Sequence, residues 1–92
     1  RKVKVLLMTP TADRTRMEGY QGDDRPKLPE QAEQIRRMAE EYGVGLVDSL
    51  AAFDRYQREE GALWDLLGWI NHPNRKGHEL VARELMRWFP VV

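Results

Sequence analysis

The residues best suited to proton-transfer chemistry lie in the stretch "WINHPNRKGHELVAREL", which runs from Trp69 to Leu85. His72 in this stretch is one of two histidines in the chain. Pro73 biases the backbone of His72 toward an extended conformation, and Asn74 stands where it can cap a following helix. A general base must be oriented before its pKa matters, and this setting holds an imidazole in place. The residues alone leave two interpretations open: a proton-transferring histidine, or the more common case of an imidazole that only hydrogen-bonds a neighbouring loop.

The two histidines do not match a metal-binding pattern. His72 and His78 lack the i, i+4 spacing of zinc-binding histidines on one helix, and no carboxylate supplies an obvious third ligand. The chain contains no cysteine, which excludes disulfides and thiolate metal sites. The sequence therefore predicts no metal and no other cofactor.

The elements that would position His72 begin with a strand, a helix and a second strand. The apolar run at Lys2–Met8 predicts a strand buried in a parallel sheet. Apolar residues recur every three or four positions from Pro29 to Tyr42, which predicts a helix that Gly43 ends. Val44–Asp48 predicts the second strand. This order is a βαβ unit, so we expect an α/β fold with parallel strands and a right-handed crossover.

Further helices are expected toward the C-terminus. Ser49 is a plausible N-cap for a helix, and "ALWDLLG" at 62–68 predicts one more helical turn. Asn74 would cap a last helix whose apolar face carries Val81, Leu85 and Trp88, with Trp88 expected in the core. Between the first strand and the first helix, Thr9–Pro29 has no apolar period. Loops of that length are often lids over a ligand, although an ordinary surface loop is an equal alternative.

Two parallel strands do not make a complete sheet, because parallel sheets are covered on both faces and have further neighbours. The edge at "KVKVLLM" would need covering. We therefore expect half of an α/β domain, completed either by a missing N-terminal half or by a second copy in a homo-oligomer. The start at Arg1 rather than Met fits a longer parent protein.

Composition excludes several classes of function. The 92 residues suffice for at most one small domain, and 15 basic residues balance 15 acidic ones. Without a basic surplus, binding to nucleic acid is not expected. No apolar run is long enough to span a membrane. No signal peptide is recognised, but the chain opens at Arg1 rather than Met, so targeting cannot be judged from this N-terminus. The location stays open, with the cytoplasm slightly favoured.

Three stretches of the chain together resemble the SGNH (GDSL-type) hydrolases. "HPNRKGHELVAREL" is similar to the last block of that family, where His-Pro-Asn precedes a Gly-His pair and an amphipathic helix. "VLLMTPTAD" resembles the strand and loop after the family's Asn-bearing block. "EQAEQIRRMAEEYGVGLVDSLAAF" resembles the helix, strand and helix before the histidine. The likeness covers nearly the whole chain in the family's order.

This resemblance implies a fold and an activity. Residues 1–92 would form the C-terminal part of a single SGNH domain, about half of a flavodoxin-like three-layer α/β/α fold. The parent would be a serine esterase or lipase that hydrolyses acyl esters of lipids, sugars or small alcohols without a cofactor. His72 would be the catalytic base that deprotonates the serine and then protonates the leaving alcohol. His78 matches a recurrent position early in the helix and would be structural.

The chain departs from the family pattern in two places. The family has an Asp three residues before the histidine, and Trp69 stands there. Either a backbone carbonyl orients His72, or a carboxylate comes from elsewhere; Asp65 is the nearest upstream acid and is interpreted as solvent-facing. The nucleophile is also missing, because Ser49 is the only serine and no family motif surrounds it. The isolated chain is therefore expected to be inactive.

Trp69 supports two different interpretations. Beside His72 it could line a substrate pocket, so we assign it a substrate-binding role. The same substitution also favours an alternative function, a non-catalytic α/β binding or assembly module that keeps the scaffold of an esterase.

Overall fold

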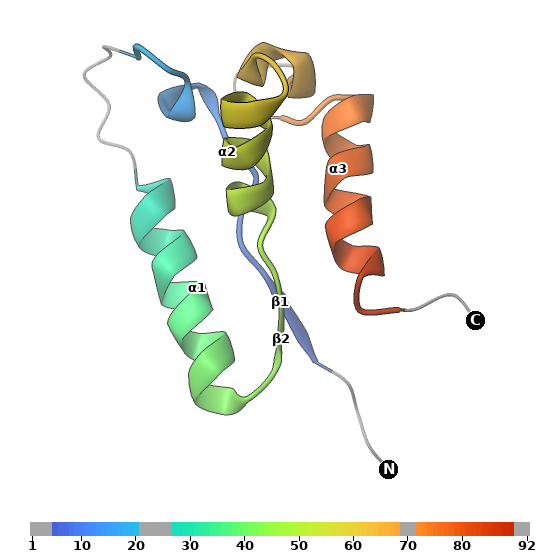
Figure 1. The fold of residues 1–92 in the computed structure, drawn as a ribbon. Coiled ribbons are helices and arrows are strands. Elements are labelled where there is room, and N and C mark those ends of the chain that lie inside the picture. The colour runs from blue at the N-terminus through green and yellow to red at the C-terminus, as the bar shows by residue number, and fades with distance from the viewer. Residues whose placement is uncertain (1–4, 21–26, 69–71, 90–92) are drawn as a thin grey trace.

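The computed structural model describes residues 5–20, 27–68 and 72–89 (Figure 1). Along these residues a strand, a helix, a second strand and further helices follow one another in the predicted order. The elements are β1 (Leu6–Met8), the 3-10 helix η1 (Arg14–Arg16), α1 (Leu28–Tyr42), β2 (Gly45–Val47), α2 (Ser49–Glu59), the 3-10 helix η2 (Leu63–Leu66) and α3 (Arg75–Met86). None of the helices within the described residues is long and apolar enough to cross a membrane.

The predicted α/β class is confirmed, because β1 and β2 form a parallel pair with Leu7 opposite Leu46. α1 connects the two strands, and Figure 1 shows α1 on one side of the pair and α3 on the other. α1 contacts both strands and α3 contacts β2. The described part therefore has helices on both faces of a sheet. Its second strand is shorter than predicted, because Asp48 leaves it to cap α2.

α1 follows the sequence prediction closely. Pro29 lies in its first turn, where a missing backbone N–H costs no hydrogen bond. Gly43 ends the helix with φ of 64°, a left-handed conformation that glycine adopts at little cost. Ala32 and Ala39 are buried on the face toward the strands and the core. Local signals alone are sufficient to place this helix.

The N-cap of α2 is Asp48, and the prediction of Ser49 was wrong by one residue. The Asp48 carboxylate accepts a hydrogen bond from the backbone N–H of Ala51 at 3.1 Å. Ser49 is the first helical residue and is completely buried. Both residue types favour N-caps, so tertiary burial rather than local preference decides between them.

A hydrophobic core lies where α2, η2 and the segment after β1 meet. Phe53 of α2 is fully buried within it, and Leu63 and Leu66 anchor η2 to it. Its buried residues are Ala12, Ala32, Leu50, Phe53, Leu63, Leu66 and Leu67. Because η2 is anchored in this core, the connection that leaves η2 toward α3 starts from a fixed point.

The described part of the long predicted loop, Thr9–Tyr20, is attached to α2. Arg16 forms an ion pair with Asp54, with Nη2 to Oδ2 at 2.5 Å and Nε to Oδ1 at 3.2 Å. The amide of Gln57 donates to the Arg16 carbonyl oxygen at 2.8 Å and accepts from the Glu18 N–H at 2.9 Å. These bonds favour the surface-loop interpretation of Thr9–Tyr20 over a lid.

α3 ends at Met86, two residues before Trp88, so Trp88 does not extend the helix face as predicted. Trp88 is 39% exposed rather than buried in the core. Its indole lies over β2, where Nε1 donates to the Leu46 carbonyl oxygen at 2.9 Å. A Cβ on Gly45 would lie 3.2 Å from the same ring, so the glycine leaves room for it.

Candidate active site

His72 lies in the connection between η2 and α3 and is exposed to solvent. Its carbonyl oxygen accepts a hydrogen bond from the Gly68 N–H at 2.9 Å. Next to it, Leu67 and Pro73 form an isolated antiparallel bridge. The backbone of His72 is thus tied down while the residue remains accessible. Trp69, the predicted substrate-binding residue, lies outside the described residues.

Asn74 caps α3, as the sequence predicted, and makes further bonds that it did not predict. The Oδ1 atom of Asn74 accepts from the Gly77 N–H at 2.9 Å, which is the helix cap. Its Nδ2 atom donates to the carbonyl oxygens of Asp65 at 2.8 Å and Leu67 at 3.4 Å. Its backbone N–H donates to the Leu66 carbonyl oxygen at 2.8 Å. One side chain therefore joins the first turn of α3 to η2, across the connection that carries His72.

Gly77 allows α3 to approach η2 closely. It is buried, and a Cβ at this position would collide with the Leu66 carbonyl oxygen and lie 2.9 Å from Cβ of Pro73. It would also lie 3.3 Å from the ring of Phe53. The Gly in the Gly-His pair after His-Pro-Asn thus has a packing role, because it lets the first turn of α3 pack against η2.

Asp65 is the upstream acid that could have oriented His72. Its carboxylate instead accepts a hydrogen bond from the hydroxyl of Tyr56 on α2 at 3.0 Å. The ammonium of Lys76 lies 5.1 Å from the centroid of the Tyr56 ring, on the α3 side. Asp65 is exposed, and its side chain ties η2 to α2.

A polar cluster occupies the carboxyl ends of the two strands, where ligands gather in α/β sheets. Thr9 follows β1 and Asp48 follows β2, and the Thr9 hydroxyl donates to the Asp48 carboxylate at 2.9 Å. Arg36 of α1 donates to both Asp48 oxygens, at 2.7 and 3.0 Å. The Leu50 N–H donates to the Thr9 hydroxyl oxygen at 3.0 Å. These groups are satisfied by one another, which indicates that the cluster holds the strand ends together.

The charge state of Asp48 follows from this cluster. Burial disfavours its charged form, but hydrogen bonds from Arg36, the Ala51 N–H and Thr9 outweigh burial and lower the pKa of Asp48. The same pairing raises the pKa of Arg36. Asp48 is therefore a structural anion rather than a group poised to transfer protons near neutral pH.

Ser49 cannot serve as the nucleophile that His72 would activate. It is completely buried, and its hydroxyl has no hydrogen-bond partner among the described residues. A substrate carbonyl cannot reach a buried side chain without opening the core. Since Ser49 is the only serine of the sequence, a Ser-His mechanism needs a serine from beyond these 92 residues.

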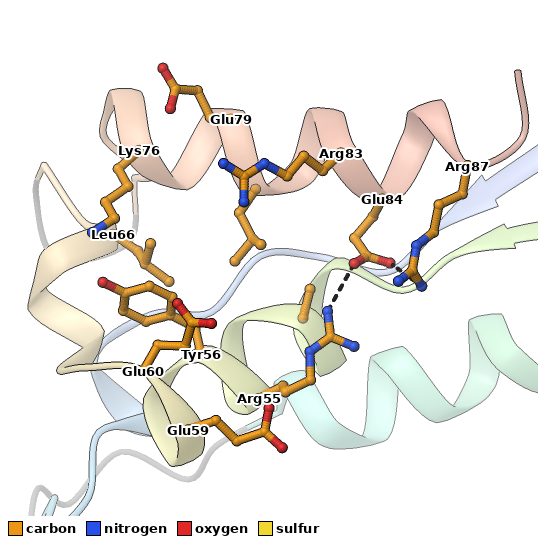
Figure 2. Close-up of a pocket in the computed structure, with 12 residues that line it drawn as sticks. Arg55, Tyr56, Glu59, Glu60, Leu66, Lys76, Glu79, Arg83, Glu84 and Arg87 are labelled. Carbon is orange, nitrogen blue, oxygen red and sulfur yellow. Dashed lines mark hydrogen bonds and ion pairs between the residues drawn. The ribbon is translucent and has the colours of Figure 1, made fainter. Parts of the chain in front are cut away.

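A groove of about 450 Å³ lies between α2 and α3 (Figure 2). Its walls carry Arg55 and Tyr56 from α2, Arg83 and Glu84 from α3, and Arg87, the residue after α3. Figure 2 shows Glu84 between two arginines, with Arg55 Nη2 at 3.0 Å and Arg87 Nη1 at 3.4 Å. His72 does not line this groove. The groove between α2 and α3 is therefore distinct from the candidate active site.

No group of three or more His, Cys, Asp or Glu residues that could hold a metal ion occurs in the described ranges. His78 lies on α3 and is exposed.

The sequence predicted Asn74 only as a helix cap and did not indicate its bonds to η2. The bonds from its Nδ2 atom depend on the tertiary position of η2, which no local pattern in the sequence indicates.

Comparison with known proteins identifies similar folds. No protein-family model and no curated protein sequence matches the chain. Among solved structures, the acetylxylan esterase Axe2 from Geobacillus stearothermophilus is 27% identical, with a TM-score of 0.73 over 97% of this chain and 39% of that one. LAE5, an alpha/beta hydrolase enzyme from the metagenome of Lake Arreo in Spain, is 29% identical. Its TM-score is 0.70, over 91% of this chain and 37% of that one.

The chain therefore spans less than two fifths of the length of these enzymes. Two further matches are described as catalytic mutants of Axe2, one with a serine and one with an aspartate replaced by alanine. The fold of this chain is that of part of an esterase, in agreement with the resemblance of its sequence to SGNH hydrolases.

Proposed function

We propose that the chain is the C-terminal part of an SGNH-type serine ester hydrolase and supplies its catalytic histidine. His72 takes the proton from a serine hydroxyl as that oxygen attacks the ester carbonyl, and then gives the proton to the departing alcohol. The observation that carries the proposal is an exposed His72 whose carbonyl oxygen is held by the Gly68 N–H, in a chain with the fold of an esterase part. The serine belongs to a segment beyond these residues.

The imidazole of His72 needs an orienting partner, and neither the family's Asp position nor the nearest upstream acid supplies one. Trp69 occupies the family's Asp position, and the Asp65 carboxylate is bonded to Tyr56. The orienting group is therefore a backbone carbonyl oxygen or a carboxylate of the missing segment. A base without its carboxylate partner keeps part of its catalytic effect. Trp69, three positions before His72 in the sequence, is assigned to the wall of the substrate site.

The substrate class is an acyl ester. An acetylated xylo-oligosaccharide is the first candidate, because Axe2 is described as an acetylxylan esterase. Acyl esters of lipids and small alcohols are the wider class. Comparison of kcat/KM for acetylated xylo-oligosaccharides with that for lipid and small-alcohol esters decides among them.

Within the part of the chain that the structure describes, β1 pairs only with β2, and its free outer edge supports completion of the sheet by another segment. Alternate residues of a parallel strand direct their backbone groups to the same neighbour. The Thr9 N–H donates to the Val47 carbonyl oxygen at 3.0 Å, which places odd-numbered residues of β1 toward β2. The backbone groups of Leu6 and Met8 therefore point to the outer edge, where a further strand would pair with them.

The opposite edge of the sheet is partly covered. The indole of Trp88 donates to the outward carbonyl oxygen of Leu46 on β2. Addition of a strand is thus expected at β1, by the missing N-terminal segment of the esterase domain. A homo-oligomer in which a second copy occupies this edge is the other outcome, and it would appear as a concentration-dependent mass in sedimentation.

Hydrolysis by the complete protein tests the proposed function. We expect turnover of a p-nitrophenyl acetate probe and of acetylated xylo-oligosaccharides, and a fall in kcat of about 10³-fold or more for His72→Ala. His78→Ala is the matched control, since His78 is also exposed and lies six positions further along the chain. Equal activity of the two variants would remove His72 from the mechanism.

One observation favours the alternative of a non-catalytic module. The only serine is buried, so these residues alone cannot form an acyl-enzyme. If the complete protein lacks a reactive serine, the chain would instead belong to a binding or assembly module with the scaffold of an esterase.

A further inference from the structure

We infer that Asn74 is a positioning residue for the base His72, acting through its Nδ2 donor, separately from its role as helix cap. This inference rests on the proposed function of His72. The cap needs only an acceptor, because Oδ1 receives the Gly77 N–H at 2.9 Å. The Nδ2 bonds to the carbonyl oxygens of Asp65 and Leu67 contribute nothing to the cap.

These two donor bonds hold the start of the connection that carries His72. Leu67 is the first residue after η2, and its neighbour Gly68 donates to the His72 carbonyl oxygen at 2.9 Å. The backbone N–H of Asn74 binds the Leu66 carbonyl oxygen at 2.8 Å from the other end. Asn74 therefore fixes both ends of the connection relative to each other, and His72 lies between them.

The η2 end of the connection is itself anchored to the rest of the molecule. Asp65, whose carbonyl oxygen receives Nδ2, is bonded through its carboxylate to Tyr56 of α2 at 3.0 Å. Leu66 is completely buried. Contacts thus run from α2 through η2 and Asn74 to His72. A base displaced by about 1 Å can lose about 100-fold in rate, so loosening this link should affect catalysis more than stability.

Asn74→Asp separates the two roles of the side chain. A carboxylate still accepts the Gly77 N–H and is favourable at a helix N-terminus. It cannot donate to the carbonyl oxygens of Asp65 and Leu67, and its charge repels them. Asn74→Ser is a second variant that retains a cap but is too short to reproduce both donor bonds. Asn74→Ala removes the cap as well and reports the cost of losing it.

The test combines amide hydrogen exchange with kinetics on the complete protein. For Asn74→Asp we expect exchange of the Gly68 amide to accelerate about tenfold or more, while the His78 amide of α3 keeps its protection. We expect kcat to fall about 10- to 100-fold with little change in KM. Asn74→Ser should behave in the same way, and the unfolding midpoint of both variants should stay closer to the native value than that of Asn74→Ala.

The outcomes separate this inference from the proposed function. If His72→Ala is inactive and Asn74→Asp keeps native Gly68 exchange or native kcat, the positioning role is overturned while the function stands. If the His78 amide loses protection together with Gly68, Asn74 is only a cap and the inference is overturned. If His72→Ala retains activity, the proposed function itself fails, and with it the positioning of a base.

Discussion

The carbonyl oxygen of Leu66 lies so close to Gly77 that no side chain fits between η2 and α3. Gly77→Ala would therefore push the two elements apart or bend the connection that carries His72. We expect the free energy of unfolding to fall by about 1–3 kcal/mol, as for other overpacked sites, and kcat to fall with it. Urea unfolding of the purified protein measures the first effect.

A matched control for this substitution exists in the same unit. A Cβ on Gly68 would have its nearest contact 3.5 Å away, at the side chain of Asn74, which is ordinary packing distance. Gly68→Ala should therefore leave stability nearly unchanged. If Gly68→Ala and Gly77→Ala unfold at the same urea concentration, the close packing of α3 on η2 is not what Gly77 provides.

Asp48 should make stability depend on pH. Its pKa is lowered in the folded state, so its contribution is present above the ordinary carboxyl pKa of about 3.9 and is lost as pH falls through the folded pKa. Asp48→Asn keeps a capping side chain but loses the charge that pairs with Arg36. We expect the variant to be about 1 kcal/mol less stable at pH 7, since the pair is partly exposed.

The difference in unfolding free energy between the native protein and Asp48→Asn, followed against pH, tests this prediction. Urea unfolding of the native protein and Asp48→Asn at pH 7, 5 and 3 should show the gap narrowing only in the acidic range. A gap that is constant across these conditions would mean that the charge on Asp48 contributes no stability, and that the variant acts through packing alone.

The sequence predicted best those features that neighbouring residues determine. Pro29 and Gly43 mark the ends of α1, and Asn74 marks the start of α3, because caps and backbone conformations are local. The α/β class and parallel pairing followed from the order of the elements. The predicted N-cap Ser49 failed because burial of that residue, which local preference does not report, favours Asp48 as the cap.

Contacts between residues far apart in the sequence could not be predicted from local patterns. The Arg16–Asp54 pair joins residues 38 positions apart and turns a predicted loop into an attached segment. Trp88 was expected in the core, yet it lies over the edge of β2 with its indole bonded to Leu46. For the candidate site, the sequence indicated His72 and its cap, whereas the donor bonds of Asn74 to η2 required the packed structure.

Ser49 offers a test of the assignment that it is neither a cap nor a nucleophile. Its hydroxyl is buried without a partner, so Ser49→Ala removes an unsatisfied polar group and adds a residue with higher helix propensity. We expect unchanged or higher stability, by up to about 1 kcal/mol, and unchanged esterase activity. Thermal unfolding and the same acetate assay measure both.

Substitution of Asp48, the residue before Ser49, provides the comparison for this test. Asp48→Ala removes the true cap of α2 and should cost about 1 kcal/mol or more. If Ser49→Ala is the more destabilising of the two, or if it abolishes turnover, the structure has assigned the roles of these residues wrongly.

Intact-mass spectrometry of the natural protein, with and without a fluorophosphonate probe, is the sharpest test of whether this chain is part of a serine ester hydrolase. We expect a mass well above the 10.8 kDa of these 92 residues, one covalent adduct on a serine, and loss of that adduct in His72→Ala but not in His78→Ala. A protein of 10.8 kDa that takes no adduct would contradict it, because the residues would then stand alone without a nucleophile.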